Sequence, residues 1–184
     1  MSYYDDNARE YIDKTINCDM RAQYSMLLKY VKKGTLLDVG FGSGRDMLYF
    51  KSKGFEVFGI DPTLAFCNHA RSLDLNVEQS TIENYNTNKK FDVIWVCASL
   101  LHCKDLNSAF KKCYDLLKQN GIMYVSLKVG EGEENIDNRY FHYVSHDSLS
   151  SIIYKNNFKV LKECITEDSL SNRNVDWINC ILTK

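Results

Sequence analysis

The chain alternates between short apolar runs and longer segments with helical periodicity. The short runs are rich in β-branched and aromatic residues, which favour strands, and the segments between them place apolar residues every three to four positions, as amphipathic helices do. The expected strands are residues 35–39, 55–60, 76–78, 91–97 and 122–128. The expected helices are residues 45–53, 64–73 and 106–118. This alternation predicts a mainly parallel sheet with helices on both faces.

The two ends of the chain depart from this alternation. Residues 8–32 carry one long helical repeat that ends at Gly34, and we expect a helical lid there. In the last third, a polar loop at 130–138 precedes three further elements. These are a helix at 148–156 and strands at 158–166 and 175–183. The last two strands have no helix between them and should pair antiparallel.

We therefore expect a single domain over residues 1–184. Residues 1–34 form its helical lid, and residues 35–184 form a three-layer α/β core. The core contains a seven-stranded, mostly parallel sheet whose last strand is antiparallel, with helices on both faces.

Composition narrows the classes of partner. Basic and acidic residues number 23 and 24, so the formal charge is −1 and no global field attracts a polyanion. Nucleic acid is therefore not the expected partner. The acidic start of the chain is unlike a secretory signal, and no apolar run reaches membrane-spanning length. Seven scattered cysteines without zinc-type spacing indicate reduced core thiols and no metal site. We expect a cytoplasmic monomer or homodimer.

A glycine loop lies between the first expected strand and the helix that follows it. Its pattern is Gly40-x-Gly42-x-Gly44. Glycine lets the backbone approach a ligand closely, and the start of a helix offers unpaired N–H groups. Asp61 and Pro62 follow at the end of the second strand, where a carboxylate can accept hydrogen bonds from both hydroxyls of a ribose. This combination predicts a site for an adenosine-containing cofactor.

Two cofactor classes fit such a site, dinucleotides and S-adenosylmethionine. A dinucleotide loop reads G-x-G-x-x-G, whereas the third glycine here comes one residue early. Asp38 stands two residues before the first glycine, where its carboxylate would repel a pyrophosphate and attract the amino group of a methionine moiety. The charge pattern therefore favours S-adenosylmethionine.

Residues 38–44 (Asp-Val-Gly-Phe-Gly-Ser-Gly) resemble the first motif of the class I methyltransferases, with Phe41 where that family commonly has cysteine. Asp61 matches the acid of the second motif. Residues 91–102 and 116–124 resemble two later motifs, although Gln119-Asn120 replaces the usual Pro-Gly. The resemblance spans residues 35–129 and implies a Rossmann-like fold that uses S-adenosylmethionine and releases S-adenosylhomocysteine. Gly44-Arg45-Asp46 is also similar to the tellurite-resistance and type 11/12 methyltransferase group.

The resemblance and the expected sheet edge give the candidate cofactor contacts. Thr81 and Ile82 resemble the segment that contacts adenine, and Ser99 follows the fourth strand. The complete set is Asp38, Gly40, Gly42, Gly44, Arg45, Asp61, Pro62, Thr81, Ile82 and Ser99. His102 is the candidate acid–base residue, since an unperturbed pKa of about 6.5 suits proton transfer near neutrality. The alternative is that His102 only lines or caps the pocket.

The candidates for the acceptor pocket and the lid lie outside these motifs. They are Tyr3, Tyr4, Tyr11, Arg21, Leu101, Lys128 and Arg139. Arg21 or Arg45 would pair with the methionine carboxylate. Lys128 and Arg139 would hold an acidic acceptor, or else only offset the glutamates of the polar loop. For the tyrosines, the alternative is packing of an amphipathic helix on the sheet.

We expect methyl transfer to a small-molecule acceptor by in-line displacement. Two alternatives remain open from the sequence. One is a methyltransferase that acts on tRNA or another macromolecule. The other is a module that binds S-adenosylmethionine or S-adenosylhomocysteine without turnover.

Overall fold

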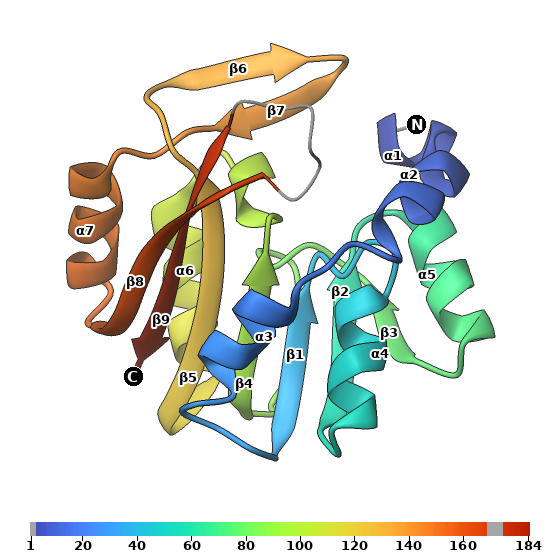
Figure 1. The fold of residues 1–184 in the computed structure, drawn as a ribbon, viewed down its shortest axis with the longest axis horizontal. Coiled ribbons are helices and arrows are strands. Elements are labelled where there is room, and N and C mark those ends of the chain that lie inside the picture. Colours follow the sequence, from blue (N-terminus) through green and yellow to red (C-terminus); the bar gives the residue numbers. More distant parts are fainter. Residues whose placement is uncertain (1–2, 169–174) are drawn as a thin grey trace.

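A seven-stranded sheet forms the centre of the molecule (Figure 1). The computed structural model describes residues 3–168 and 175–184. The strands of the sheet are β1 (Thr35–Val39), β2 (Glu56–Asp61), β3 (Asn76–Gln79), β4 (Phe91–Cys97), β5 (Leu117–Lys128), β8 (Lys159–Glu167) and β9 (Asp176–Thr183). Their order across the sheet is β3-β2-β1-β4-β5-β9-β8.

The pairing of the strands confirms the predicted topology. The strands β3, β2, β1, β4 and β5 pair in parallel, and β9 pairs antiparallel with both β5 and β8. The strand order reverses between β1 and β4. Ligands of doubly wound folds bind in the crevice at such a reversal, outside the carboxyl ends of the strands.

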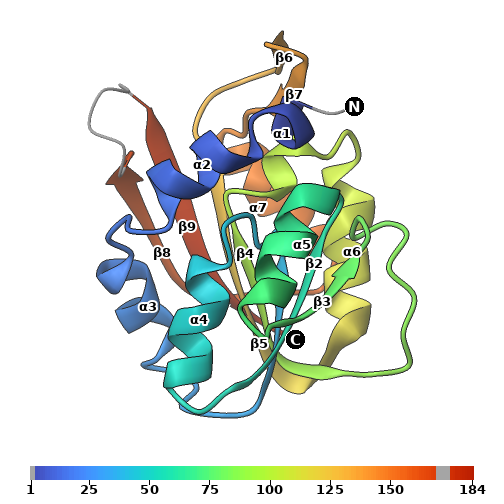
Figure 2. The same ribbon diagram turned by 90° about the vertical axis from the view of Figure 1, so that its right-hand side faces the viewer.

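Helices cover both faces of the sheet, as predicted (Figures 1 and 2). One face carries α3 (Arg21–Leu27), α4 (Arg45–Ser52) and α5 (Leu64–Ser72), and the other carries α6 (Leu106–Leu116) and α7 (His146–Lys155). Two short helices, α1 (Tyr3–Asp6) and α2 (Ala8–Thr15), lie near α5 at the upper edge of the sheet (Figure 2). The result is a three-layer α/β domain.

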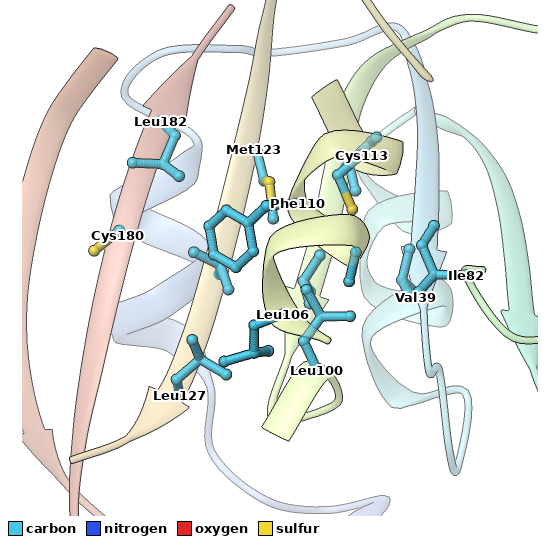
Figure 3. Close-up of a cluster of buried hydrophobic side chains, with 14 of the residues drawn as sticks. Val39, Ile82, Leu100, Leu106, Phe110, Cys113, Met123, Leu127, Cys180 and Leu182 are labelled. Carbon is cyan, nitrogen blue, oxygen red and sulfur yellow. The ribbon is translucent and has the colours of Figure 1, made fainter. Parts of the chain in front are cut away.

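Each face of the sheet has its own hydrophobic cluster. Leu106 and Phe110 of α6 pack with Met123 of β5 on one face (Figure 3). On the other face, the ring of Trp95 stacks on that of Tyr124 with centroids 3.9 Å apart. These side chains are almost completely buried, so the central strands are held between two apolar layers.

The prediction of one helix over residues 8–32 is wrong. The structure has α2 and α3 there, preceded by α1, with a break at residues 16–20. Asp19 causes the restart, because its Oδ1 accepts the backbone N–H of Arg21 at 3.0 Å. A short polar side chain that bonds to nearby backbone competes with helix continuation.

The prediction of a loop at 130–138 is also wrong, because the segment forms an antiparallel hairpin. Its strands are β6 (Glu133–Ile136) and β7 (Arg139–His142). Asp137 and Asn138 connect them with φ of 50° and 59°, and such positive values suit a two-residue hairpin turn. The exposed, polar β6 has none of the apolar alternation that predicts a strand.

The boundary between the helix predicted at 106–118 and the strand predicted at 122–128 also differs from the prediction. Helix α6 ends at Leu116 and β5 begins at Leu117, so Asn120 and Gly121 lie within β5 instead of ending the helix. Asn120 has φ of 61°, in the region where the pairing of β4 with β5 shifts register. Asn-Gly therefore marks an irregularity inside a strand here.

A buried carboxylate joins three elements on the α3–α4 face. Asp46, in the first turn of α4, accepts the Tyr24 hydroxyl at 2.5 Å and the Trp95 indole N–H at 2.8 Å. It also accepts the Nε–H of Arg45 at 2.6 Å. Helices α3 and α4 and strand β4 are thus tied to one side chain.

We expect Asp46→Ala to lower the free energy of unfolding by about 3–5 kcal/mol, since it leaves a largely buried guanidinium without its counterion. Tyr24→Phe removes a single hydrogen bond and should cost about 1 kcal/mol. Urea unfolding followed by circular dichroism measures both losses. Equal losses in the two variants would contradict a central role for Asp46.

Candidate functional site

A cavity of about 320 Å³ opens at the carboxyl ends of β1, β2 and β4, where the strand order reverses. We call it the larger cavity. Seven of the predicted cofactor contacts line it, namely Gly40, Gly42, Asp61, Pro62, Thr81, Ile82 and Ser99. Sequence segments that lie far apart therefore meet at one edge of the sheet, as the strand order requires.

The glycine loop presents bare backbone to this cavity. Gly40 has φ of 73° and Gly42 has φ of 53°, conformations that side chains rarely adopt. A Cβ at Gly40 would overlap the side chain of Ser99, and one at Gly42 would come within 3.1 Å of the Tyr11 ring. Gly44 has a different place. It directly precedes α4 and is not among the described residues that line the cavity.

Asp61 is held in place by two backbone donors. Its Oδ2 accepts the N–H of Gly42 at 3.1 Å, and its Oδ1 accepts the N–H of Thr63 at 2.8 Å. Burial raises the pKa of the Asp61 carboxyl, and these two hydrogen bonds oppose that rise. Each oxygen of a carboxylate can accept a further hydrogen bond. The carboxylate is therefore oriented and still able to bind a pair of hydroxyls.

Asp38 is the buried acid at the end of β1. Its side chain is almost fully enclosed, and its Oδ2 has no hydrogen-bond partner in the described part of the chain. Burial, and then the charge of Asp46, raise the pKa of the Asp38 carboxyl well above its ordinary value. A buried carboxylate oxygen without a donor is costly. The charge of Asp38 suits the ammonium of a methionine moiety, which would relieve that cost, but Asp38 is not among the described residues that line either cavity.

His102 stands where the fourth strand turns into the next helix. Ala98 leaves β4 in the left-handed region, at φ of 53°, and a 3₁₀ turn (Leu100–His102) follows. The ring Nδ1 lies 2.7 Å from the carbonyl oxygen of Tyr140, and Nε2 lies 2.9 Å from the hydroxyl of Tyr4. Because a carbonyl only accepts, we assign the proton to Nδ1, and Nε2 then accepts from Tyr4.

Burial lowers the pKa of the His102 imidazole, and the charges of Arg139 and Lys128 lower it further. The neutral ring is therefore favoured near neutral pH. A neutral histidine whose Nε2 carries a lone pair is able to take up a proton.

A smaller cavity of about 180 Å³ adjoins the larger one. Tyr4, Tyr11, Ala98 and His102 line both cavities, so the two meet at these residues. The rings of Tyr4 and Tyr11 lie 5.4 Å apart, and Tyr11 also packs 5.2 Å from Phe66 of α5. Helices α1 and α2 therefore cover the junction between the cavities.

Besides Tyr4 and Tyr11, three more of the predicted acceptor and lid residues line the smaller cavity: Leu101, Lys128 and Arg139. Arg45 lines it too, but its guanidinium is engaged by Asp46 through Nε at 2.6 Å and Nη2 at 3.0 Å. The two remaining predicted residues lie outside its lining. Tyr3 packs on Arg139, with its ring centroid 4.1 Å from the guanidinium carbon. Arg21 is exposed and paired with Asp19, so the structure gives it no contact with either cavity.

Some residues of the site escaped prediction from the sequence. The carbonyl of Tyr140 reaches His102 from the unpredicted hairpin. Thr63 and Phe66 line the larger cavity beside Asp61. The Thr63 N–H lies two residues after Asp61, the spacing at which an aspartate accepts a backbone hydrogen bond in an Asx turn, and that spacing was the available signal. Phe66 occupies an ordinary apolar position of α5, and nothing in the sequence distinguishes it as a residue of the site.

The described residues also bear on three other features: metal clusters, membrane-spanning helices and a nucleophilic thiol. Over 3–168 and 175–184, no group of three or more His, Cys, Asp and Glu side chains is placed to hold a metal ion. No helix in the same ranges is long and apolar enough to cross a membrane. Burial raises the pKa of the Cys103 thiol beside His102, and a thiol that resists ionisation is a poor nucleophile.

Known proteins resemble the chain in sequence. Residues 37–125 match a family model described as a methyltransferase domain. Over 97 residues the chain is 29% identical to the ubiquinone biosynthesis O-methyltransferase of Rhodopseudomonas palustris, a match that covers 50% of this chain and 38% of that protein. Over 156 residues it is 26% identical to the phosphoethanolamine N-methyltransferase of Plasmodium falciparum, covering 80% and 59% respectively. The chain thus spans less than two thirds of each of these relatives.

The fold resembles that of solved methyltransferases. The chain matches the Burkholderia thailandensis 1,6-didemethyltoxoflavin-N1-methyltransferase, crystallised with 1,6-didemethyltoxoflavin and S-adenosylhomocysteine, with a TM-score of 0.79. Sequence identity is 17%, and the match covers 98% of this chain and 83% of the other. The likeness is one of fold, and it agrees with the predicted Rossmann-like architecture.

We expect Asp38→Asn to raise the thermal midpoint of the free protein near pH 7 by about 2–4 °C, the shift that 1 kcal/mol produces in a domain of this size. An acid whose folded pKa is raised destabilises the protein as pH rises above the unfolded value of 3.8, so the gain should shrink on acidification toward that value. Calorimetric melts across pH measure the difference in thermal midpoint between the variant and the wild type.

The Asp38→Asn variant should also bind S-adenosylhomocysteine at least about tenfold more weakly, because the charge expected to face the ammonium is lost. A variant that is stabilised but binds normally would remove Asp38 from the site.

Proposed function

We propose that the chain is a class I S-adenosylmethionine-dependent methyltransferase and that it transfers the methyl group to a small-molecule acceptor. One observation carries this proposal. The larger cavity, which is lined by seven of the ten predicted cofactor contacts, meets a second cavity at His102, so donor and acceptor would lie on either side of one junction. The narrower tellurite-resistance resemblance stays a prediction.

The residues of the larger cavity suit the parts of this cofactor. Asp61 would accept the ribose hydroxyls, and Thr81 and Ile82 would lie beside the adenine. The bare backbone at Gly40 and Gly42 leaves room for the methionine part, whose ammonium would face Asp38. Bound S-adenosylmethionine supplies a methyl group from its sulfonium centre. The sulfur is the leaving group, and it departs as a neutral thioether. The chain therefore has no leaving group to protonate.

The work left to the protein is alignment and exclusion of water. Alignment of reactants can contribute about 7–11 kcal/mol in favourable cases. Tyr4 and Tyr11 cover the junction where the methyl group would pass between the cavities. Their rings pack on Phe66 of α5 and so remove water from the reacting atoms.

An acceptor that loses a proton needs a base at the same junction. The hydroxyl of Tyr4 donates to Nε2 of His102, whose Nδ1–H is held by the Tyr140 carbonyl. A proton from the acceptor would pass to the Tyr4 oxygen as the Tyr4 proton moves to Nε2. This arrangement supports a hydroxyl or a protonated nitrogen as the acceptor atom. Relatives of both kinds, an O- and an N-methyltransferase, are consistent with it.

Calorimetry tests the cofactor site directly. The protein should bind S-adenosylmethionine and S-adenosylhomocysteine with micromolar affinity, and Asp61→Ala should weaken both about tenfold or more, because two hydrogen bonds to a charged group are lost. Asp115→Ala, an exposed acid paired with Lys111, is the matched control and should bind normally. Folded protein that binds neither ligand would overturn the proposal.

The pH dependence of turnover tests His102. Because its pKa is lowered, chiefly by burial, the acid limb of kcat/KM should have its midpoint below the ordinary value of 6.5. Activity should rise with pH through this limb, as the imidazole becomes neutral. His102→Gln should abolish the limb while leaving the affinity for S-adenosylhomocysteine within about threefold. A limb that survives in the variant would leave His102 with a structural role only.

A further inference from the structure

The basic residues of the chain are unevenly distributed, although they nearly balance the acidic ones. Residues 28–33 (Leu-Lys-Tyr-Val-Lys-Lys) and 154–162 (Tyr-Lys-Asn-Asn-Phe-Lys-Val-Leu-Lys) contain lysines and no acid. All of these lysines are exposed, and none forms an ion pair within the described part of the chain. They are Lys29, Lys32, Lys33, Lys155, Lys159 and Lys162.

The two segments meet in space and form one surface, which we call the lysine face (residues 28–33 and 154–162). The hydroxyl of Tyr30 donates to the carbonyl oxygen of Leu161 at 3.3 Å. The first segment leads from α3 into β1, and the second joins the end of α7 to the start of β8, toward the lower left of Figure 1. The larger cavity opens at the opposite edge of the sheet, at the carboxyl ends of the parallel strands.

Acids near the lysine face are paired with other residues. At the same edge of the sheet, Glu56 pairs with Lys89 and Asp92 pairs with Lys118. Glu163, the acid that follows the second segment, lies 3.1 Å from Nε2 of His146. The positive charge of the lysine face is therefore not offset by these carboxylates.

The lysine face also exposes large hydrophobic side chains. Tyr154 is 84% exposed, Val160 is 49% exposed, and Tyr30 and Leu161 are 41% and 39% exposed. Tyrosine is enriched where a bilayer meets water, because its ring is apolar and its hydroxyl is polar. Lysine can lie along an apolar surface and still keep its ammonium in water. Lysines beside exposed tyrosine, valine and leucine therefore suit a boundary between water and an apolar layer.

The chemistry of the lysine face distinguishes among three kinds of occupant. A second copy would bring its own lysines against these across a two-fold axis, where like charges repel. Nucleic acid is bound mainly through contacts from charged and polar side chains, which leaves the exposed Val160 and Leu161 without apolar surroundings. A bilayer with acidic phospholipids offers anionic headgroups to the lysines and an apolar layer to the other side chains.

We propose that the lysine face binds the surface of a bilayer that contains acidic phospholipids. Electrostatic attraction and shallow burial of a few apolar side chains are each weak, and together they give reversible attachment. The larger cavity would then face away from the bilayer, because it opens at the opposite edge of the sheet. The inference does not depend on the proposed function.

Flotation with lipid vesicles tests the proposal on the full chain. The vesicles consist of phosphatidylcholine alone, or of phosphatidylcholine mixed with phosphatidylglycerol. The chain should partition at least about tenfold more strongly onto the anionic vesicles, and added salt should weaken this binding by screening the lysines. Equal partitioning onto both kinds of vesicle would overturn the proposal.

Three lysines of the second segment provide the charge variant, Lys155→Gln, Lys159→Gln and Lys162→Gln combined. Each lysine near an anionic surface strengthens binding about fivefold, so this variant should lower the partition coefficient about 100-fold. Circular dichroism shows whether the variant is folded. Binding to anionic vesicles that survives in the folded variant would contradict the assignment of the lysine face.

The control removes the same charge from exposed cations elsewhere, by Arg9→Gln, Arg71→Gln and Lys104→Gln combined. It should bind anionic vesicles within about threefold of the unmodified chain, because these side chains lie outside the lysine face. Equal losses in the control and the charge variant would show a response to net charge alone and would also overturn the proposal.

Tyr154→Ser tests the apolar contribution. It should weaken binding to anionic vesicles about threefold or more, and by a similar factor at low and high salt, because burial of a ring is not screened. A loss that disappears at high salt would contradict this contribution. Binding to polyuridylate that the charge variant abolishes, without binding to vesicles, would assign the lysine face to nucleic acid and overturn the bilayer. None of these measurements requires the cofactor, so their failure would leave the proposed function untouched.

Discussion

The hydrogen bond from the Ser99 hydroxyl to the Val39 carbonyl, 2.5 Å long, joins the two strands whose ends create the site. It spans the reversal of strand order between β1 and β4, where neighbouring connections leave the sheet in opposite directions. Gly40 has no side chain because Ser99 occupies the space where a Cβ would lie. The left-handed turn at Ala98 then directs the chain into the 3₁₀ turn that carries His102. The glycine loop and the histidine are therefore positioned by one contact.

Buried charge is the second constraint on this molecule. Asp46 accepts four hydrogen bonds from three residues and joins α3, α4 and β4. Asp38, from the neighbouring strand β1, is also buried, yet its Oδ2 has no donor among the residues that the structure describes. Two buried acids thus differ in whether the fold itself satisfies them. A fully satisfied acid stabilises the fold, whereas an unsatisfied one stores free energy that a ligand of opposite charge can release.

Local patterns were enough to predict much of the site. The glycine loop, Asp61 and the strand–helix alternation occur within short stretches of sequence, and parallel strands bring such stretches to the same edge. The contacts of His102 are different in kind, because Tyr4 lies 98 residues away and Tyr140 lies 38 away. The Tyr140 contact also uses a backbone carbonyl, which no residue type reveals. The hairpin that carries it has a polar outer strand, so hydrophobic alternation gave no indication of it.

The two cavities draw on different parts of the chain. The larger cavity is lined by residues between 4 and 103, whereas the smaller cavity is lined by residues between 4 and 102 together with residues between 124 and 179. Between them stand only four shared residues, and three of these carry aromatic rings. Substitutions in β7 or β9 can therefore alter the shape and charge of the second cavity while the glycine loop and Asp61 remain as they are. If the proposed function holds, an acceptor could change through residues 124–179 alone, and relatives that resemble this chain over residues 37–125 need not share its substrate.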